Sequence, residues 1–228
     1  MVNYKSFTKS IYPKCTEMVV DNYFSTLNGF GEYKKIAIDL LKKVVDVLND
    51  SKINHFLISG TLLGHVRHQG LIPWDDDIDL IVDANLLTIL PDIIEKYKNL
   101  TFMCQNKIVK VCFKDQGVEI LEDQYKWKLP DEKYNWPFVD LFTYELKQKQ
   151  MFFFNKNWET NKFFNPKKIN FIGIETFVPN DPDYFLKINY GSRYMTELKS
   201  SSYSHKLEKS ISPIKIISFE DFERWSKN

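Results

Sequence analysis

The sequence has few cysteines, no long apolar run and almost no net charge, and each absence excludes a class of protein. Cys15, Cys104 and Cys112 are odd in number and lack C-x-x-C spacing, which argues against a disulfide framework and a structural zinc site. No stretch approaches the roughly 20 apolar residues that a membrane-spanning helix needs. With 31 Lys and Arg against 30 Asp and Glu, no overall field attracts the protein to nucleic acid or to an acidic membrane.

The first residues also lack the apolar core of a signal peptide, because Met1 to Cys15 is polar and carries three lysines. We therefore expect a cytoplasmic protein with reduced thiols. The 228 residues, 43% of them hydrophobic, are enough for one substantial core. We expect residues 1–30 to be an extension packed on the core or trailing from it, and residues 31–228 to form a single domain.

Hydrophobic periodicity predicts a mixture of helices and strands. Apolar residues at three- and four-residue steps predict an amphipathic helix over residues 32–49. Shorter helices are predicted at 61–66, at 84–97 with Pro91 dividing or kinking it, and at 181–190 ending before Gly191. Strands are predicted at 53–58, 77–82 and 137–144, and two more, 107–113 and 118–122, are predicted around a turn at 114–117. A hairpin is predicted over 169–178 and a final short element near 214–225. Without internal repeats, this pattern predicts one α+β domain.

The stretch from Ser59 to Leu80 contains the densest set of chemically useful residues. Side chains two apart on a strand share a face, so Asp77 and Asp79 would point to one site. Their charges repel unless a cation lies between them, and hard carboxylate oxygens suit Mg²⁺ or Mn²⁺. A solvent-facing acidic loop is the alternative for residues 75–77. Asp79 and Asp140 argue against it, because each lies within an apolar strand where an unpaired carboxylate is costly.

Other residues near this motif are candidates for binding an anion. Gly60 and Thr61 follow a predicted strand and begin a predicted helix, where a phosphate could approach the backbone, although a simple turn and helix cap would use the same residues. Arg67 and His68 could hold phosphate oxygens or could be loop residues. Lys110 could reach a phosphate or could be an ordinary exposed strand lysine. His55, His65 and His205 lack metal-ligand spacing and are interpreted as core or surface residues.

These motifs resemble the LicD family, which includes phosphocholine transferases of bacterial surface glycans and fukutin-type ribitol-phosphate transferases. The resemblance covers roughly residues 35 to 195. The motifs that carry it are Gly60-Thr61-Leu62-Leu63-Gly64, Arg67-His68, Ile72-Pro73-Trp74-Asp75-Asp76-Asp77-Ile78-Asp79, Phe138-Val139-Asp140-Leu141-Phe142, and Tyr184-Phe185-Leu186 leading to Tyr190-Gly191.

The resemblance implies a nucleotidyltransferase-like catalytic domain, with a mixed β-sheet flanked by helices. It implies that Asp77, Asp79 and Asp140 are the catalytic residues and hold Mg²⁺ or Mn²⁺. Gly60 and Thr61 would contact the nucleotide's phosphates, while Arg67 would neutralise the pyrophosphate. The implied reaction moves a phosphorylated alcohol from a CDP-linked donor to a hydroxyl of a glycan or sugar acceptor.

Two other functions fit the same residues. A nucleotidyltransferase would attach the nucleotide itself to a protein, sugar or small molecule and release pyrophosphate. An inert module would keep the fold only to bind a nucleotide or glycan, although clustered acids give such a module no evident advantage. The aromatic residues between Met151 and Phe164 could form an acceptor surface, but a role in the core is the favoured interpretation.

Overall fold

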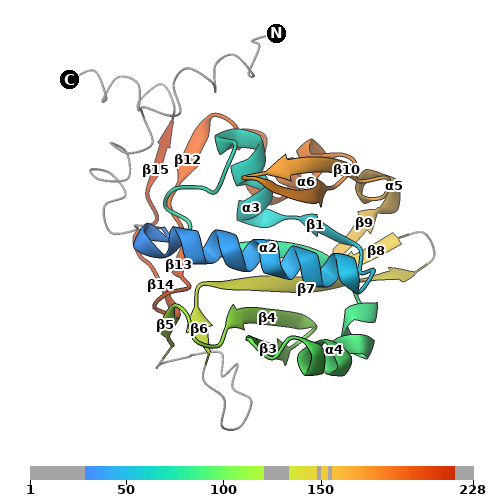
Figure 1. The fold of residues 1–228 in the computed structure, drawn as a ribbon. Coiled ribbons are helices and arrows are strands. Elements are labelled where there is room, and N and C mark those ends of the chain that lie inside the picture. The colour runs from blue at the N-terminus through green and yellow to red at the C-terminus, as the bar shows by residue number, and fades with distance from the viewer. Residues whose placement is uncertain (1–28, 121–133, 148–149, 154–155, 219–228) are drawn as a thin grey trace.

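The computed structural model describes residues 29–120, 134–147, 150–153 and 156–218 (Figure 1). Most of the predicted N-terminal extension, and the end of the final element predicted near 214–225, lie outside the described residues. Within the described part of the chain, no helix has the length and apolar character needed to cross a membrane.

A mixed β-sheet forms the centre of the fold, in the order β1–β2–β7–β4–β3, with β8 and β9 extending from β7. Its strands are β1 (His55–Leu57), β2 (Ile78–Asp83), β3 (Leu100–Gln105), β4 (Ile108–Phe113), β7 (Phe138–Lys147), β8 (Gln150–Phe153) and β9 (Lys156–Glu159). β2 and β7 run parallel, whereas the other neighbours in the sheet are antiparallel. The predicted α+β fold with a mixed sheet is therefore confirmed.

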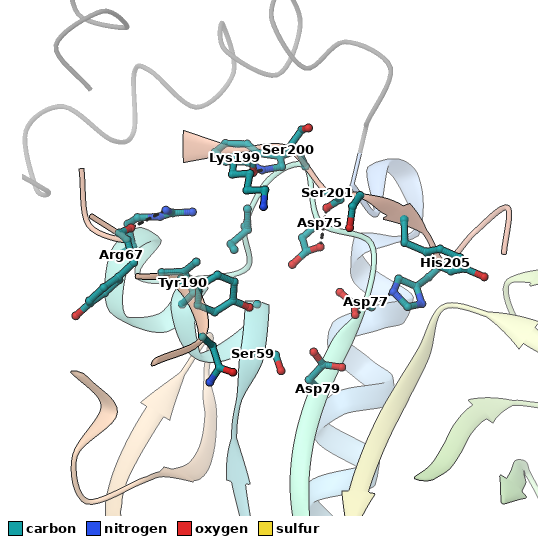
Figure 2. Close-up of a pocket in the computed structure, with 18 of the residues that line it drawn as sticks. Ser59, Arg67, Asp75, Asp77, Asp79, Tyr190, Lys199, Ser200, Ser201 and His205 are labelled. Atoms are coloured by element: carbon teal, nitrogen blue, oxygen red, sulfur yellow. Dashed lines mark hydrogen bonds and ion pairs between the residues drawn. The ribbon is translucent and has the colours of Figure 1, made fainter. Parts of the chain in front are cut away.

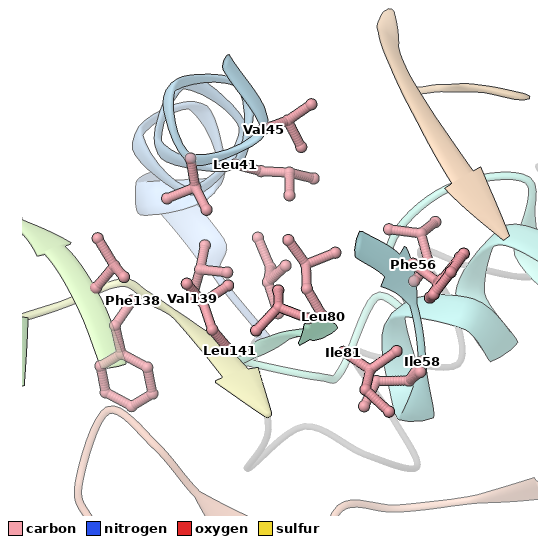
Figure 3. Packing of buried hydrophobic residues seen from close by; sticks show 14 of the residues in the cluster. Leu41, Val45, Phe56, Ile58, Leu80, Ile81, Phe138, Val139 and Leu141 are labelled. Carbon is pink, nitrogen blue, oxygen red and sulfur yellow. The ribbon is translucent and has the colours of Figure 1, made fainter. Parts of the chain in front are cut away.

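The helix α2 (Lys34–Asp50) covers one face of this sheet, as Figure 1 shows. Its buried residues recur at three- and four-residue steps, and Leu41 and Val45 point toward Leu80 and Val139 of the two central strands (Figure 3). Each such side chain contributes roughly 1.5–3 kcal/mol when fully buried. The helix predicted over 32–49 is thus confirmed, and it fixes the sheet strands that carry the aspartates.

The remaining helices agree with the sequence pattern in part. They are η1 (Gly31–Tyr33), α3 (Ser59–Leu63), the π-helical turn η2 (Gly64–His68), α4 (Asn85–Lys96), α5 (Thr160–Phe163) and α6 (Pro182–Tyr190). Pro91 does not divide α4, which continues through it. α6 begins where the Asp181 carboxylate accepts a hydrogen bond from the backbone N–H of Tyr184, and it ends at Gly191 with φ of 80°.

Two details of the strand prediction are corrected. β3 was not expected, since four consecutive residues from Leu100 to Met103 are buried and leave no alternating pattern. The short strand β5 (Val118–Glu119) does not pair with β4; it pairs with β6 (Asn135–Trp136), while β4 lies between β3 and β7. The predicted hairpin is confirmed as β10 (Lys167–Phe171) and β11 (Ile174–Val178).

The aromatic residues after β7 belong to the core. Met151, Phe153, Trp158 and Phe163 are all buried, and the Trp158 ring stacks on Phe185 of α6 with 5.2 Å between centroids. The interpretation of this segment as core is confirmed, and an acceptor surface on these four residues is excluded by their burial.

The chain after α6 forms short antiparallel pairs. β12 (Glu197–Lys199) pairs with β15 (Ile216–Ser218), and β13 (Tyr203–Ser204) pairs with β14 (Lys209–Ser210). Leu198 and Ile217 bury their side chains, which attaches this segment to the core. Ser201 and Ser204, which lie between them, donate hydrogen bonds to the aspartates that precede β2.

Candidate active site

Two parallel strands bring the predicted carboxylates together. Asp79 on β2 lies in register with Asp140 on β7, so both side chains leave the same face of the sheet. Asp77 precedes Asp79 by two residues and lines the same pocket. All three lie at the start of their strands, where the sheet meets the turn that follows β1.

That turn is built around a glycine. Ser59 has a φ of 49°, and a Cβ added to Gly60 would lie 2.2 Å from Asp75 Oδ2, so any larger residue would displace the Asp75 carboxylate. The Thr61 hydroxyl accepts a hydrogen bond of 2.8 Å from the backbone N–H of Asp79. Gly60 and Thr61 therefore fix the turn against β2, and their contact with phosphate stays a prediction.

The three adjacent aspartates, Asp75 to Asp77, contact different hydroxyl, backbone N–H and imidazole groups. The Ser201 hydroxyl donates to Asp75 at 3.0 Å. Asp76 accepts hydrogen bonds from the Ser204 hydroxyl and from the backbone N–H groups of His205 and Lys206. Asp77 Oδ2 lies 3.2 Å from His205 Nε2. These partners all come from the segment after α6, so the carboxylates hold that segment over the end of the sheet.

Burial and mutual repulsion make the charged form of these acids costly. Burial raises the pKa of Asp77 to about 7, with the charges of Asp76 and Asp140 adding to the effect. Burial, Asp77 and Asp140 raise the pKa of Asp79 well above its ordinary value. The pKa of Asp75 is raised in the same way, by burial and then by Asp77 and Asp76. Such concentrated, displaced pKa values are typical of a functional site.

A cavity of about 320 Å³ opens between the aspartates and the segment after α6 (Figure 2). One side is formed by Ser59, Gly60, Asp75, Asp77 and Asp79. The other side carries Tyr190, Tyr194 and the segment from Glu197 to Tyr203. The volume lies in the range of small-molecule sites.

Comparison with known proteins identifies the family. The family model described as "LicD/FKTN/FKRP, nucleotidyltransferase domain" matches residues 52–181, more than half of the chain. The chain belongs to the LicD family. Both the glycine turn and all three predicted catalytic aspartates lie inside the matched region, whereas the opposite side of the cavity lies after it.

Individual LicD relatives align over different parts of the chain. An uncharacterised protein of Rickettsia typhi is 31% identical over 166 residues, which are 67% of this chain and 45% of that protein. Lipopolysaccharide cholinephosphotransferase LicD of Haemophilus influenzae is 41% identical over 49 residues, 22% of this chain and 18% of that protein. Mouse ribitol-5-phosphate transferase FKTN is 26% identical over 175 residues, 74% of this chain and 35% of that protein. The chain thus spans less than half the length of each of these relatives.

Arg67, a residue of the LicD motif, lies at the edge of the cavity, but its side chain forms hydrogen bonds mainly with other groups of the protein. Its side chain is 3% exposed, and Nη1 donates to the carbonyls of Tyr194 and Glu197 at 2.8 and 2.9 Å. Its Nε donates to His68 Nε2, and the His68 ring packs edge-on against Trp74. Burial, then the charge of Arg67, holds the pKa of His68 well below its ordinary value. The structure places His68 behind the lining of the cavity, and phosphate binding by either residue stays a prediction.

Lys110 is buried beside the third carboxylate instead of exposed on its strand. Its Nζ lies 3.2 Å from Asp140 Oδ1, 3.9 Å from Glu208 Oε1, and over the ring of Phe138. With 2% of its surface exposed, it compensates the charge of Asp140 and does not reach the cavity lining. Direct phosphate binding by Lys110 stays a prediction that this burial disfavours.

Sequence reasoning missed the residues after α6 that lie around the aspartates and Lys110. His205 was interpreted as a core or surface histidine, but it contacts Asp77. Ser201, Ser204 and Glu208 also lie in a polar stretch with no periodic pattern. The run of serines, tyrosine and histidine from Ser200 to His205 was the available signal, since a stretch of hydroxyl and imidazole groups can bind carboxylates.

The site residues fit a divalent cation chemically. Among the described residues, no three His, Cys, Asp or Glu side chains form a ready-made metal site. Asp77 and Asp79 nevertheless offer oxygen ligands, which Mg²⁺ and Mn²⁺ prefer. Burial, and then repulsion between the acids, raises their pKa values, and the charge of a bound cation would offset both effects.

Proposed function

We propose that the protein is a metal-dependent transferase that moves a phosphorylated alcohol from a CDP-linked donor to a hydroxyl of a glycan acceptor. The observation that carries the proposal is the convergence of Asp77 and Asp79 with the Ser59–Gly60 turn on one cavity, in a chain of the LicD family. The names of two relatives, a cholinephosphotransferase and a ribitol-5-phosphate transferase, support a phosphoalcohol as the transferred group.

Asp77, Asp79 and Asp140 would hold Mg²⁺ or Mn²⁺ in this proposal. A bound ion of this kind neutralises negative charge on the phosphates and on the leaving nucleotide. Lys110 forms an ion pair with Asp140 and would partly neutralise its charge. The glycine turn and the segment after α6 would position the donor between the two sides of the cavity.

The acceptor hydroxyl needs a group that removes its proton. A carboxylate of the aspartate group, such as Asp77 at the cavity lining, could take this proton. His205 holds the Asp77 side chain in place from the other side. Together these residues would orient the reactants and stabilise charge, and positioning and electrostatic stabilisation are the main contributions a protein makes to phosphoryl transfer.

The proposal is tested by incubating the purified protein with CDP-choline, CDP-ribitol, CDP-glycerol or CTP, in Mg²⁺ or Mn²⁺ and in EDTA. Nucleotide products are separated and identified by mass spectrometry. No glycan acceptor is present, so water takes the phosphorylated alcohol, and we expect slow release of CMP from one CDP-alcohol, only when the metal is present. Release of pyrophosphate from CTP would instead indicate nucleotidyl transfer, and binding without any product would indicate an inert module.

The variant Asp79→Asn tests whether the Asp79 carboxylate takes part in the proposed reaction. We expect CMP release to fall at least 100-fold, because the amide removes a charged ligand from the centre of the site. The melting temperature should hold or rise, since the substitution also removes a repelled, buried charge. Turnover equal to that of the wild type would remove Asp79 from the mechanism.

A further inference from the structure

The positively charged side chains that the sequence suggested as phosphate ligands already contact other groups of the protein. Arg67 Nη1 donates to two backbone carbonyls and its Nε to His68, while Lys110 lies with Asp140 and Glu208. His205, the third cationic candidate at the site, contacts Asp77. A donor carrying two phosphates would therefore meet mainly carboxylates on the β2 side of the cavity.

Lys199 is placed differently. It lines the cavity from β12, on the side opposite Asp79, and Figure 2 shows its ammonium group pointing into the space between the two sides. Its side chain is exposed, and within the described part of the chain it has no ion pair or side-chain hydrogen bond. Lys199 is thus a cation that faces the cavity and whose donors are not used by any other described residue.

The backbone of Lys199 is held firmly although its side chain is exposed. Its carbonyl accepts a hydrogen bond of 2.9 Å from Trp74 Nε1, and its strand pairs with β15 opposite Ile216. The preceding residue, Leu198, is buried in the core, so alternation along the strand directs Lys199 to the other face. A long flexible side chain on a fixed backbone can follow a phosphate while the strand stays in place.

We propose that Lys199 binds a phosphate oxygen of the donor's diphosphate, so that the two phosphates are held between this ammonium group and the aspartate side of the cavity. The inference rests on the proposed function for the nature of the donor. It also locates a binding determinant after residue 181, outside the region that the family model matches. Donor affinity in this chain is then set partly by a segment that the shared motifs do not include.

The test compares the wild type with Lys199→Gln, Lys199→Arg and the control Lys209→Gln by calorimetric titration. Lys209 lies on β14 of the same segment, is exposed and does not line the cavity. The probes are CDP, cytidine and inorganic pyrophosphate, each with Mg²⁺ at low and high salt. Melting temperatures verify that every variant is folded.

We expect Lys199→Gln to weaken CDP binding about tenfold at low salt, by loss of a charge-assisted hydrogen bond. The loss should shrink at high salt, be absent for cytidine, and be largely restored in Lys199→Arg. Lys209→Gln should bind as the wild type does. Equal CDP affinity in wild type and Lys199→Gln would overturn the inference and leave the proposed function intact.

The pyrophosphate titration separates the two proposals. If the wild type binds pyrophosphate but not CDP, the proposed cytidine-linked donor is wrong. In that case, weaker pyrophosphate binding by Lys199→Gln would support the inference, and unchanged binding would overturn it. If the wild type binds neither compound in the presence of Mg²⁺, a phosphate site at Lys199 is overturned as well.

Discussion

Asp75, Asp76 and Asp77 are consecutive in the chain, yet their surroundings give them different roles. Asp76 accepts three hydrogen bonds from residues 204–206 and is a structural anchor for that segment. Asp77 faces the cavity and Asp79, and its charged form is opposed by burial and by its acidic neighbours. The chemistry of the site therefore depends on which carboxylate is satisfied by the protein and which is left for a ligand.

The raised pKa of Asp77 makes a prediction about stability without metal. Between the ordinary pKa of 3.8 and about 7, the folded protein binds a proton at Asp77 that the unfolded chain does not. Stability from this group is therefore present at low pH and is lost as pH rises toward 7. Asp77→Asn removes this titration, so its stability relative to the wild type should increase between pH 5 and pH 8, by on the order of 2–4 kcal/mol.

Urea unfolding of both proteins in EDTA at several pH values measures this difference. Added Mg²⁺ should reduce it at pH 8, because a cation offsets the charge in the wild type. A difference that stays constant from pH 5 to pH 8 would show that Asp77 is not destabilised by its surroundings.

At the scale of elements, Arg67 connects the turn after α3 to the chain after α6. Its two hydrogen bonds to the carbonyls of Tyr194 and Glu197 join residues more than 120 positions apart in sequence. Both elements contribute to the cavity, so this connection sets the distance between its two sides. A buried arginine with carbonyl partners serves the site mainly by holding these elements together.

Arg67→Met should therefore lower the free energy of unfolding by about 2–4 kcal/mol, because two buried carbonyls lose a charged donor. Arg193→Met is a matched control, since Arg193 is exposed and forms a surface ion pair with Glu197, where about 0–1 kcal/mol is expected. Urea unfolding measures both. Unchanged stability in Arg67→Met combined with weaker nucleotide binding would instead support the phosphate role that the sequence predicts.

The elements that were predicted correctly are those whose burial follows a simple period. α2 has one buried face, and the β10–β11 hairpin turns at Ile172 and Gly173, both with positive φ. β3 was missed because it is buried at four consecutive positions. The pairing of β4 with β3 and β7 was missed too, since a strand's partner is decided by contacts distant in sequence.

At the scale of the whole molecule, the site is assembled from two parts that the sequence describes unequally. The D-x-D strand, the glycine turn and Asp140 form compact motifs, and the structure brings Asp79 and Asp140, which were predicted to share a site, into register on parallel strands. The opposite side is formed by polar side chains whose hydrogen bonds to Asp75 and Asp76 leave no periodic trace in the sequence. Half of the cavity was therefore predictable from motifs and the other half needed the fold.

This two-part construction predicts where a bound donor will change the protein's motions. The segment after α6 is fastened to the aspartates by side-chain hydrogen bonds and by short strands, so it should open more often than the central sheet. CDP with Mg²⁺ contacts both sides and suppresses that opening by mass action. Hydrogen exchange followed by mass spectrometry should show slower exchange in residues 197–206 and no change in α4, which lies away from the cavity. Protection limited to residues 59–79 would mean that the donor binds the aspartate side alone, and the segment after α6 would then be a support for the fold instead of a wall of the active site.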